Sequence, residues 1–461
     1  MSKYLELRPD NVNSDSTISF KAGFPVLSFT IQSQNAILDP RTIRINGELQ
    51  INKGFDAGVG VPVRAEDGAD GITMDNRLGV FALWDQLIVR HQKTAQIMEH
   101  IRHYNKYMST YLGLSSSLQD KAGHLNQTIL TQPNEDAMFH NVVCSAGTNV
   151  AALPGRKNQF SCHHPCGVLA SGQSINLMES SLGGIRIEIH LSPDSNCLFS
   201  RSGVVNAGNA EAHYVLSNLS LSCEVQEIPE ERMSEMAAQT SGALDFNTIS
   251  SLYTTFNTSN SQIQYDVGLK ALQSAFLTFA PSENINTLTA NGLATTYPSQ
   301  VGAAGTLVNM ERVQFLKGGS KYPVDYDITT NKTVPLNTDV ATAGAVATFS
   351  SADSQLALQF AEAVIPEYMT ERTSLSPLNL NRNYVMSIAG EQGYKNQING
   401  GPLFGLGMRY SQFNSGQDFS REQWGVSFNN TLVTDHPISV FMFFKAKTTV
   451  VFSPEGLQVL N

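Results

Sequence analysis

The most regular pattern of apolar and polar residues lies near the middle of the chain. From Ile185 to Leu191, isoleucine or leucine alternates with Arg, Glu and His, and a period of two predicts a strand with one buried face. The alternation returns from Leu219 to Gln226 and stops before Pro229, which cannot donate a hydrogen bond to a sheet. The pattern therefore predicts two half-buried strands and a boundary close to mid-chain.

The end of the chain repeats this arrangement. Apolar runs rich in Val, Ile and Phe occupy residues 425–428, 438–444 and 449–452. Two halves that end alike predict one β-module used twice. All-β units commonly run to about 200–250 residues, which also favours two modules in 461 residues. We expect residues 1–230 to form the first module, 231–244 a linker and 245–461 the second.

The first half begins with two predicted strands, at 17–31 and 42–51. Asn46-Gly47 interrupts the second of these and indicates a turn or bulge. Residues 54–76 are predicted to form a Gly-rich, solvated loop. Its acidic residues lack the spacing of a calcium-binding loop, and they are Asp56, Glu66, Asp67, Asp70 and Asp75.

Helices are expected beside the strands in both halves. Residues 78–89 predict a buried strand, and an apolar stripe from Ile97 to Tyr111 predicts a helix of about four turns. Residues 230–239 predict a short linker helix. In the second half a helix starts near Ser354, carries apolar residues at helical spacing and ends before Pro366. Residues 244–256 are expected to begin the second module, and strands are predicted around residues 263–267, 275–279 and 313–323.

Composition supports the same class. Charged residues make up 15% of the chain, and 35 glycines indicate frequent turns. The net charge of −10 and the absence of a basic run exclude a dedicated nucleic-acid binder. Residues 1–10 lack the pattern of a signal peptide, and no apolar run is long enough for a transmembrane segment. The expected class is mainly β.

Two sequence clusters invite a metal-site interpretation, but each has a simpler one. His100 and His103 with Glu99 form an H-x-x-H pair, which we interpret as the polar flank of a helix because further zinc ligands are missing. The run from Cys162 to Cys166 contains two Cys and two His but no second C-x-x-C pair. Five cysteines are odd in number and suit free thiols in a reducing compartment, without a disulfide or bound zinc.

Catalytic motifs are not found. Asp325 and Asp327 are two apart on one strand and are interpreted as an exposed face, not an acid–base pair. The glycines around Gly58 and Gly405 are interpreted as loop glycines, not phosphate-binding motifs. We therefore predict no catalytic, cofactor-binding or metal-binding residue, no cofactor and no enzymatic activity.

The order of these segments resembles the double jelly-roll major capsid proteins of the adenovirus, virophage, polinton-like and nucleocytoplasmic large DNA virus lineage. The resemblance rests on residues 81–112, 183–227, 266–279, 317–323 and 419–459. It implies two consecutive antiparallel jelly-roll sandwiches with short helices packed on them. It also implies a structural protein whose homotrimeric, pseudo-hexameric capsomers tile an icosahedral shell.

The resemblance further implies where the protein acts and with which partners. These are itself as a homotrimer, neighbouring capsomers, and penton and minor capsid proteins, all in the virion. The alternative is a glycan-binding or glycan-hydrolysing double β-sandwich, because jelly rolls also serve lectins and hydrolases. A phage tail protein also trimerises, but the sequence has no fibrous repeat or coiled coil.

Overall fold

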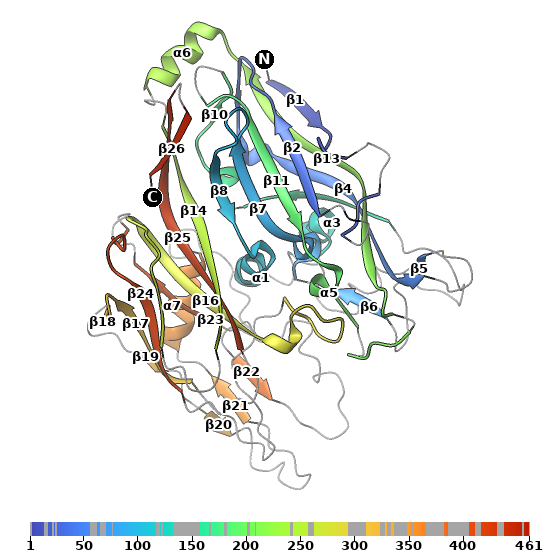
Figure 1. The fold of residues 1–461 in the computed structure, drawn as a ribbon, viewed down its shortest axis with the longest axis vertical. Helices are drawn as coiled ribbons and strands as arrows, with labels where there is room; N and C mark the ends of the chain where they lie inside the picture. The colour runs from blue at the N-terminus through green and yellow to red at the C-terminus, as the bar shows by residue number, and fades with distance from the viewer. Residues whose placement is uncertain are drawn as a thin grey trace.

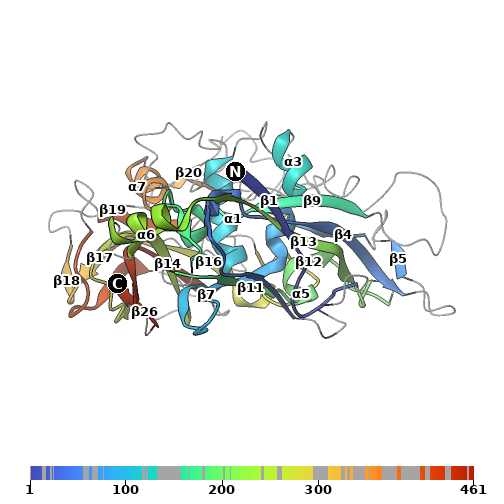
Figure 2. The ribbon, with the colours of Figure 1, turned by 90° about the horizontal axis from the view of Figure 1, so that it is seen from above.

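The structure is a computed structural model, and its chain forms two β-modules side by side (Figure 1, Figure 2). The residues that it describes are 2–12, 17–20, 23, 25–55, 62–64, 71–75, 77–116, 120, 123–131, 157–165, 167–178, 182–200, 203–207, 209–239, 243–256, 262–293, 310–322, 328–329, 333–335, 348–351, 354–365, 382–385, 405–410, 416–430, 438–453 and 456–460. The predicted mainly β class is confirmed.

The first module consists of antiparallel sheets that enclose one apolar core. Its seven-stranded sheet contains β1 (Ser2–Leu7), β3 (Ala36–Leu38), β4 (Arg44–Phe55), β5 (Pro62–Arg64), β9 (Asn158–His163), β10 (Ile175–Asn176) and β13 (His213–Glu227). The four-stranded sheet has the order β2 (Val26–Ile31), β11 (Ile185–Leu191), β7 (Trp84–His91) and β8 (Ile97–Ile101). A short pair joins β6 (Ile72–Met74) and β12 (Leu198–Ser200).

The two central predicted strands are present as β11 and β13. Burial alternates at every residue of β11, which lies between β2 and β7. The irregularity expected at Asn46-Gly47 also exists, but β4 runs straight through it. The extra residue lies in β13, where Asn218 has a positive φ of 52° and the register shifts between Ser217 and Ser220. Gly47 faces this bulge because a Cβ atom there would lie 2.7 Å from Leu219.

The second module has two five-stranded antiparallel sheets. One contains β14 (Ala243–Phe256), β16 (Leu272–Pro281), β23 (Gly405–Arg409), β25 (Ile438–Ser453) and β26 (Gly456–Leu460). The other contains β15 (Gln262–Tyr265), β17 (Met310–Lys317), β18 (Ser320–Lys321), β19 (Ile328–Thr329) and β24 (Trp424–Asn430). A three-stranded sheet is formed by β20 (Thr333–Pro335), β21 (Thr348–Ser351) and β22 (Arg382–Val385).

Helices connect and cover these sheets. The α-helices are α1 (Tyr104–Ser115), α3 (His124–Ile129), α5 (Asp194–Cys197), α6 (Glu230–Gln239) and α7 (Ser354–Val364). The 3-10 helices are η1 (Pro40–Thr42), η2 (Gly79–Leu83), η4 (Gly167–Ala170) and η5 (Ser282–Asn284). The predicted linker helix and the predicted helix of the second half are thus confirmed as α6 and α7.

The long helix predicted from Ile97 is wrong in its first part. Residues 97–101 form strand β8, which pairs with β7, and α1 begins only at Tyr104. His103 separates the two elements with a positive φ of 51°, a conformation that ends the strand sharply. The apolar residues of strand β8 and helix α1, taken together, have the spacing of a single helix, although the two elements are separate. Residues 79–83 of the predicted buried strand are likewise η2, and β7 starts at Trp84.

Two loop predictions are also wrong within the described residues. The segment 54–76 contains β5 and β6, and Asp75 is fully buried instead of solvated. Gly405 and Gly407 belong to strand β23, not to a loop. A Cβ atom on either one would overlap Phe360 or Ala363 of α7, so glycine lets this helix approach the strand closely.

One apolar core joins the two modules. It starts between the sheets of the first module and continues through Tyr107 of α1 to Phe276, Phe360 and Phe443 of the second module. A separate core lies between the two five-stranded sheets of the second module. The module limits at residues 230 and 245 stay a prediction, with β13 ending at Glu227 and β14 beginning at Ala243.

Candidate functional site

The contact between the two modules combines a continuous apolar core with buried polar links, and we call it the module junction. It is formed by β8, α1 and η4 of the first module and by β14, β16, β25 and residues 282–293 of the second. Figure 1 shows α1 at its centre, between β7 and the sheet of β16 and β25. The junction decides how the two modules are held relative to one another.

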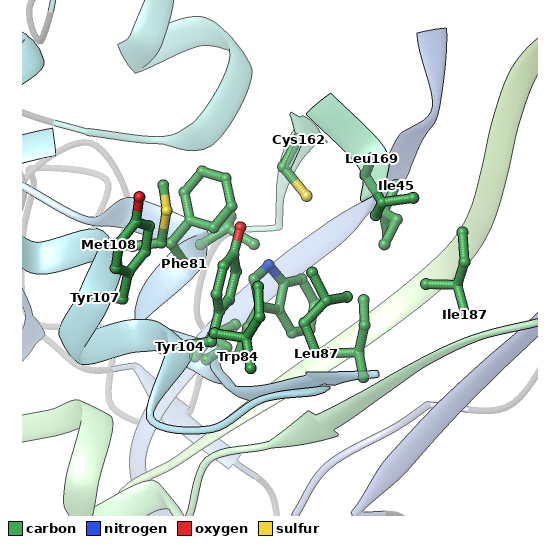
Figure 3. Packing of buried hydrophobic residues seen from close by; sticks show 14 of the residues in the cluster. Ile45, Phe81, Trp84, Leu87, Tyr104, Tyr107, Met108, Cys162, Leu169 and Ile187 are labelled. Atoms are coloured by element: carbon green, nitrogen blue, oxygen red, sulfur yellow. The ribbon is translucent and has the colours of Figure 1, made fainter. Parts of the chain in front are cut away.

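Aromatic rings form the apolar part of the junction. The Tyr107 ring centroid lies 6.0 Å from that of Phe276 and 5.7 Å from that of Phe443, and the two phenylalanine rings are 5.1 Å apart. Ring pairs in this range contribute about 0.5–1.5 kcal/mol each beyond their burial. On the first-module side, Figure 3 shows α1 residues gathered beside Phe81 and Trp84. Helix α1 is therefore packed on both modules at once.

Glu99 of β8 makes a polar link across the junction. Its carboxyl accepts hydrogen bonds from the Val168 backbone N–H of η4 at 2.8 Å and from the Thr248 hydroxyl of β14 at 3.1 Å. The side chain is buried, and burial raises its pKa to about 7 against the pull of these hydrogen bonds. Glu99 is thus a buried carboxyl that titrates near neutral pH.

Lys106 of α1 forms a second link, to the segment that follows η5. Its ammonium group donates a hydrogen bond to the carbonyl oxygen of Gly292 and lies 4.8 Å from the centroid of the Phe441 ring. Ser109, one turn further along α1, donates to the carbonyl oxygen of Leu293 at 3.0 Å. Burial lowers the pKa of Lys106 to about 7. This segment of the second module is therefore bound along one side of α1.

A buried ion pair holds the same segment from the other end. Arg77 Nη2 lies 2.8 Å from Asp75 Oδ2, and Asn291 Nδ2 donates to the same oxygen at 2.9 Å. Burial opposes the ionisation of Asp75, but the Arg77 guanidinium keeps the pKa of this carboxyl below its ordinary value. Removing one partner of such a pair leaves an uncompensated buried charge. The pair fixes Asn291 on the first module.

Helix α7 meets the junction through its carboxyl end. Lys445 of β25 donates to the carbonyl oxygen of Val364 and lies 5.7 Å from the centroid of the Tyr107 ring. Ser274 of β16 donates to the carbonyl oxygen of Ala363 at 2.7 Å. Both donors satisfy carbonyls that the last turn of a helix leaves unpaired. The two helices are thereby connected through β25.

The predicted H-x-x-H pair is not brought together. His100 Nε2 lies 2.9 Å from the Gln86 side-chain oxygen, whereas the His103 ring packs 5.1 Å from the centroid of the Phe441 ring. Glu99 points to η4 and β14 instead. Because β8 is a strand, successive side chains leave on opposite faces. The helix-flank interpretation is wrong, although Glu99 and His103 both contribute to the junction.

The Cys-His cluster is part of the core. Cys162 is buried and free, and the indole N–H of Trp84 points to its thiol, a weak acceptor. His163 Nδ1 lies 3.2 Å from the Ile43 carbonyl oxygen, and His164 Nδ1 lies 2.9 Å from the Tyr104 hydroxyl. Across the described residues, no three His, Cys, Asp or Glu side chains gather as metal ligands would. Cys144, Cys166, Asp325 and Asp327 lie outside the described residues.

An open groove lies at the tip of the β17–β18 hairpin. It has a volume of about 500 Å³ and is lined by Lys317, Gly318, Ser320, Lys321, Tyr322 and Glu422. Glycan hydrolysis ordinarily needs two carboxylates on either side of the bond, and this lining contains only Glu422. The groove does not have the composition of a hydrolase site.

The junction residues were not identified from the sequence. The usable signal was a charged residue directly beside a large apolar one, such as Glu99 after Met98 or Lys106 before Tyr107. Charged residues are rarely fully buried unless they are paired, so a charged residue in such a position is ordinarily expected to be exposed. Their partners in the second module, Thr248 and Gly292, lie 149 and 186 residues away in sequence, which no local pattern reveals.

No family model and no curated relative matches the sequence. Solved structures match the fold. The cryo-EM structure of the Sputnik virophage matches with a TM-score of 0.57 and 10% identity, covering 100% of this chain and 88% of that one. A crystal structure of VP54 from PBCV-1, fitted into a reconstruction of Sputnik, matches with a TM-score of 0.51 and 8% identity, covering 100% and 96%. A quasi-atomic model of the PBCV-1 capsid has a TM-score of 0.51 at 10% identity, covering 100% and 97%.

These matches concern the fold, because identities of 8–10% carry no residue-level information. They extend over both modules, including the junction. The sequence-based resemblance and the predicted pair of consecutive jelly-roll sandwiches are confirmed. The chain has the double jelly-roll fold that is found in the capsid proteins of PBCV-1 and Sputnik.

Proposed function

We propose that this protein is the major capsid protein of an icosahedral virus and acts as a structural component of the virion, not as an enzyme. The observation that supports this most is the match of the whole chain, both modules together, to structures of the Sputnik virophage and the PBCV-1 capsid. A fold alone does not fix function. The described residues add a second argument, since the buried Glu99 and Asp75 serve the module junction and no three His, Cys, Asp or Glu side chains among them gather as metal ligands would.

In this proposal three copies form a cyclic homotrimer, and their six modules give a capsomer with pseudo-hexagonal outline. Residues 1–230 and 245–461 supply one jelly roll each. Such a capsomer needs a fixed angle between the two modules of every chain, because six corners must repeat evenly around the axis. The continuous core and the buried links of the junction favour a rigid two-module block.

The surface properties suit assembly with other protein subunits. Neighbouring capsomers, penton proteins and minor capsid proteins are the partners that we propose. The net charge of −10 argues against direct condensation of nucleic acid by this chain. None of the helices in the described part of the chain is long and apolar enough to cross a bilayer.

Light scattering combined with negative-stain electron microscopy tests the proposal. A homotrimer has a mass of about 150 kDa, three times the 50.2 kDa of the chain, and we expect hexagonal particles at high protein concentration. Its buried interface should exceed about 2,000 Å², as in obligate assemblies. A stable monomer that never forms hexagonal particles would contradict the capsid function. Binding of that monomer to a glycan array would then support the glycan-binding alternative.

A further inference from the structure

Three elements of the junction, β8, η4 and β14, meet at the carboxyl group of Glu99. It lies on β8, at the edge of the four-stranded sheet, and is 2% exposed. Val168 of η4 bonds one carboxyl oxygen, and Thr248 of β14 bonds the other. Thr248 belongs to the second module, so the carboxyl joins the two modules directly.

The backbone around this carboxyl is shaped to hold it. Gly167 has a positive φ of 63°, and a Cβ atom there would lie 1.8 Å from Glu99 Oε2. Only glycine combines this backbone conformation with that free space. The carboxyl therefore occupies a fitted cavity between η4 and β14, not a chance gap.

The charged groups on the neighbouring elements are bound to other partners. On β7, Arg90 donates to Glu188 at 2.8 Å. On β8, His100 faces Gln86. On β14, Asp245 lies 3.6 Å from Lys447 of β25. Lys445 of β25 binds the Val364 carbonyl, and η4 consists of Gly, Val, Leu and Ala. Glu99 is thus held by hydrogen bonds and not by an opposite charge.

We propose that Glu99 is a proton-operated latch between the two modules, which holds η4 and β14 against β8 when neutral and loosens this contact when ionised. The neutral carboxyl still accepts hydrogen bonds from the backbone N–H groups of Val168 and Ile249, and it can donate its own proton to the Thr248 hydroxyl. In the closed junction the ionised Glu99 side chain has the same hydrogen-bond donors, but it has lost the water that stabilises its charge. Ionisation therefore raises the free energy of the closed junction. The latch is a property of the single chain and does not depend on capsid assembly.

The direction of the effect follows from proton linkage. The pKa of Glu99 is about 7 in the closed junction, against 4.5 for the ordinary side chain. Between pH 4.5 and 7, the Glu99 carboxyl is protonated when the junction is closed and ionised when the junction is open and hydrated. The ratio of closed to open junction therefore falls as pH rises from 4.5 to 7 and then stays constant. The full change is about 300-fold, one factor of ten for each pH unit of this window.

Hydrogen–deuterium exchange of the full chain between pH 5.5 and 8.0 tests the latch. After correction for intrinsic exchange rates, peptides covering residues 97–101, 167–170 and 245–250 should lose at least tenfold protection as pH rises. Glu99→Gln keeps the size and much of the hydrogen-bonding capacity of the side chain but cannot ionise, so its protection should not fall as pH rises. Glu224→Gln is the matched control, because Glu224 lies on β13 opposite Tyr4 of β1 and should behave as the unchanged chain.

Titration of the histidines near the junction should not cause a loss of protection as pH rises. Burial lowers the pKa values of His100, His103 and His163, so their protonation weakens the fold at low pH, which is the opposite direction. All three are retained in Glu99→Gln. Equal pH dependence of the unchanged chain and Glu99→Gln would overturn the proposal.

A second variant covers the case in which Glu99→Gln does not fold. Thr248→Val removes one donor to the carboxylate and leaves Glu99 in place, so the pH midpoint of protection should move upward. If Thr248 only stabilised the fold, the Thr248→Val substitution would lower protection equally at every pH. An unchanged midpoint in Thr248→Val, or protection of the unchanged chain that increases from pH 5.5 to 7, would also overturn the latch.

Discussion

Helices α1 and α7 both pack on sheets, but their surroundings differ. Helix α7 lies against β23 with Phe360 and Ala363 on the glycines of that strand, and its Gln359 and Glu362 are half-exposed. Helix α1 is buried on nearly all sides, and its buried residues include Asn105, Lys106, Ser109 and Thr110. An apolar stripe at helical spacing describes α7 well. It describes α1 poorly, because a helix between two modules also needs polar groups that bind distant backbone.

The comparison separates two ways of stabilising a helix. Helix α7 depends mainly on close apolar packing against one sheet. Substitutions that add volume at this contact should therefore destabilise it most. Helix α1 depends on contacts with both modules and on buried polar links, so its sensitive positions affect the whole chain.

Truncation of Tyr107 should destabilise the chain most. Tyr107→Ala removes a buried ring that contacts Phe276 and Phe443, and such large-to-small changes cost about 3–5 kcal/mol. Urea unfolding followed by fluorescence measures the loss. Tyr4→Ala is the control, because Tyr4 is 73% exposed and surface changes stay within about 0.5 kcal/mol. Equal effects of the two variants would show that α1 is not a shared centre of the modules.

The buried ammonium of Lys106 should make stability rise with pH. Its pKa is about 7 in the folded chain against an ordinary 10.5, so between these values the unfolded chain holds a proton that the folded chain has released. We expect the free energy of unfolding to increase by about 3 kcal/mol from pH 7 to 9.5. Lys106→Met should lose most of this increase, whereas Lys447→Met, at a half-exposed lysine, should keep it. Both are measured by urea titration at the two pH values.

A methyl group on β23 tests the packing of α7. In Gly405→Ala the new Cβ atom would lie 2.2 Å from the Phe360 ring, and overpacking of this kind costs about 1–3 kcal/mol. Thermal unfolding measures it. Gly172→Ala is the matched control, since a Cβ atom there meets nothing within 4 Å. If both substitutions are neutral, α7 does not depend on the absence of a side chain at residue 405.

The smallest effect on the unfolding midpoint is expected from treatment with a chelator, because we predict no bound metal. Cys162, Cys197 and Cys223 are free and buried, and burial raises the pKa of the Cys162 thiol to about 12. Native protein should react slowly with a thiol reagent at these positions, and a chelator should not change its unfolding midpoint. Mass spectrometry after unfolding in alkylating reagent should find five modified cysteines. A zinc adduct in the native mass spectrum, or fewer than five modified cysteines, would contradict this prediction.

Regular strands could be predicted because their signal is local. In β11 each residue alternates between core and surface, so the sequence carries the burial pattern residue by residue. The end of β13 was visible in Pro229 for a similarly local reason, the missing N–H of proline. The same reading failed where β8 meets α1, because His103 changes the chain direction between two elements whose apolar residues continue one another.

The sequence by itself determined the mainly β class, the repeated module and helices α6 and α7, since the period of side chains along a strand or helix is set within a few residues. Only the tertiary structure decided the junction. Glu99 and Thr248 are 149 residues apart, and Lys106 and Gly292 are 186 apart. Whether a charged side chain is solvated or buried depends on which distant segment covers it, and neither member of such a pair carries a local sign of the other.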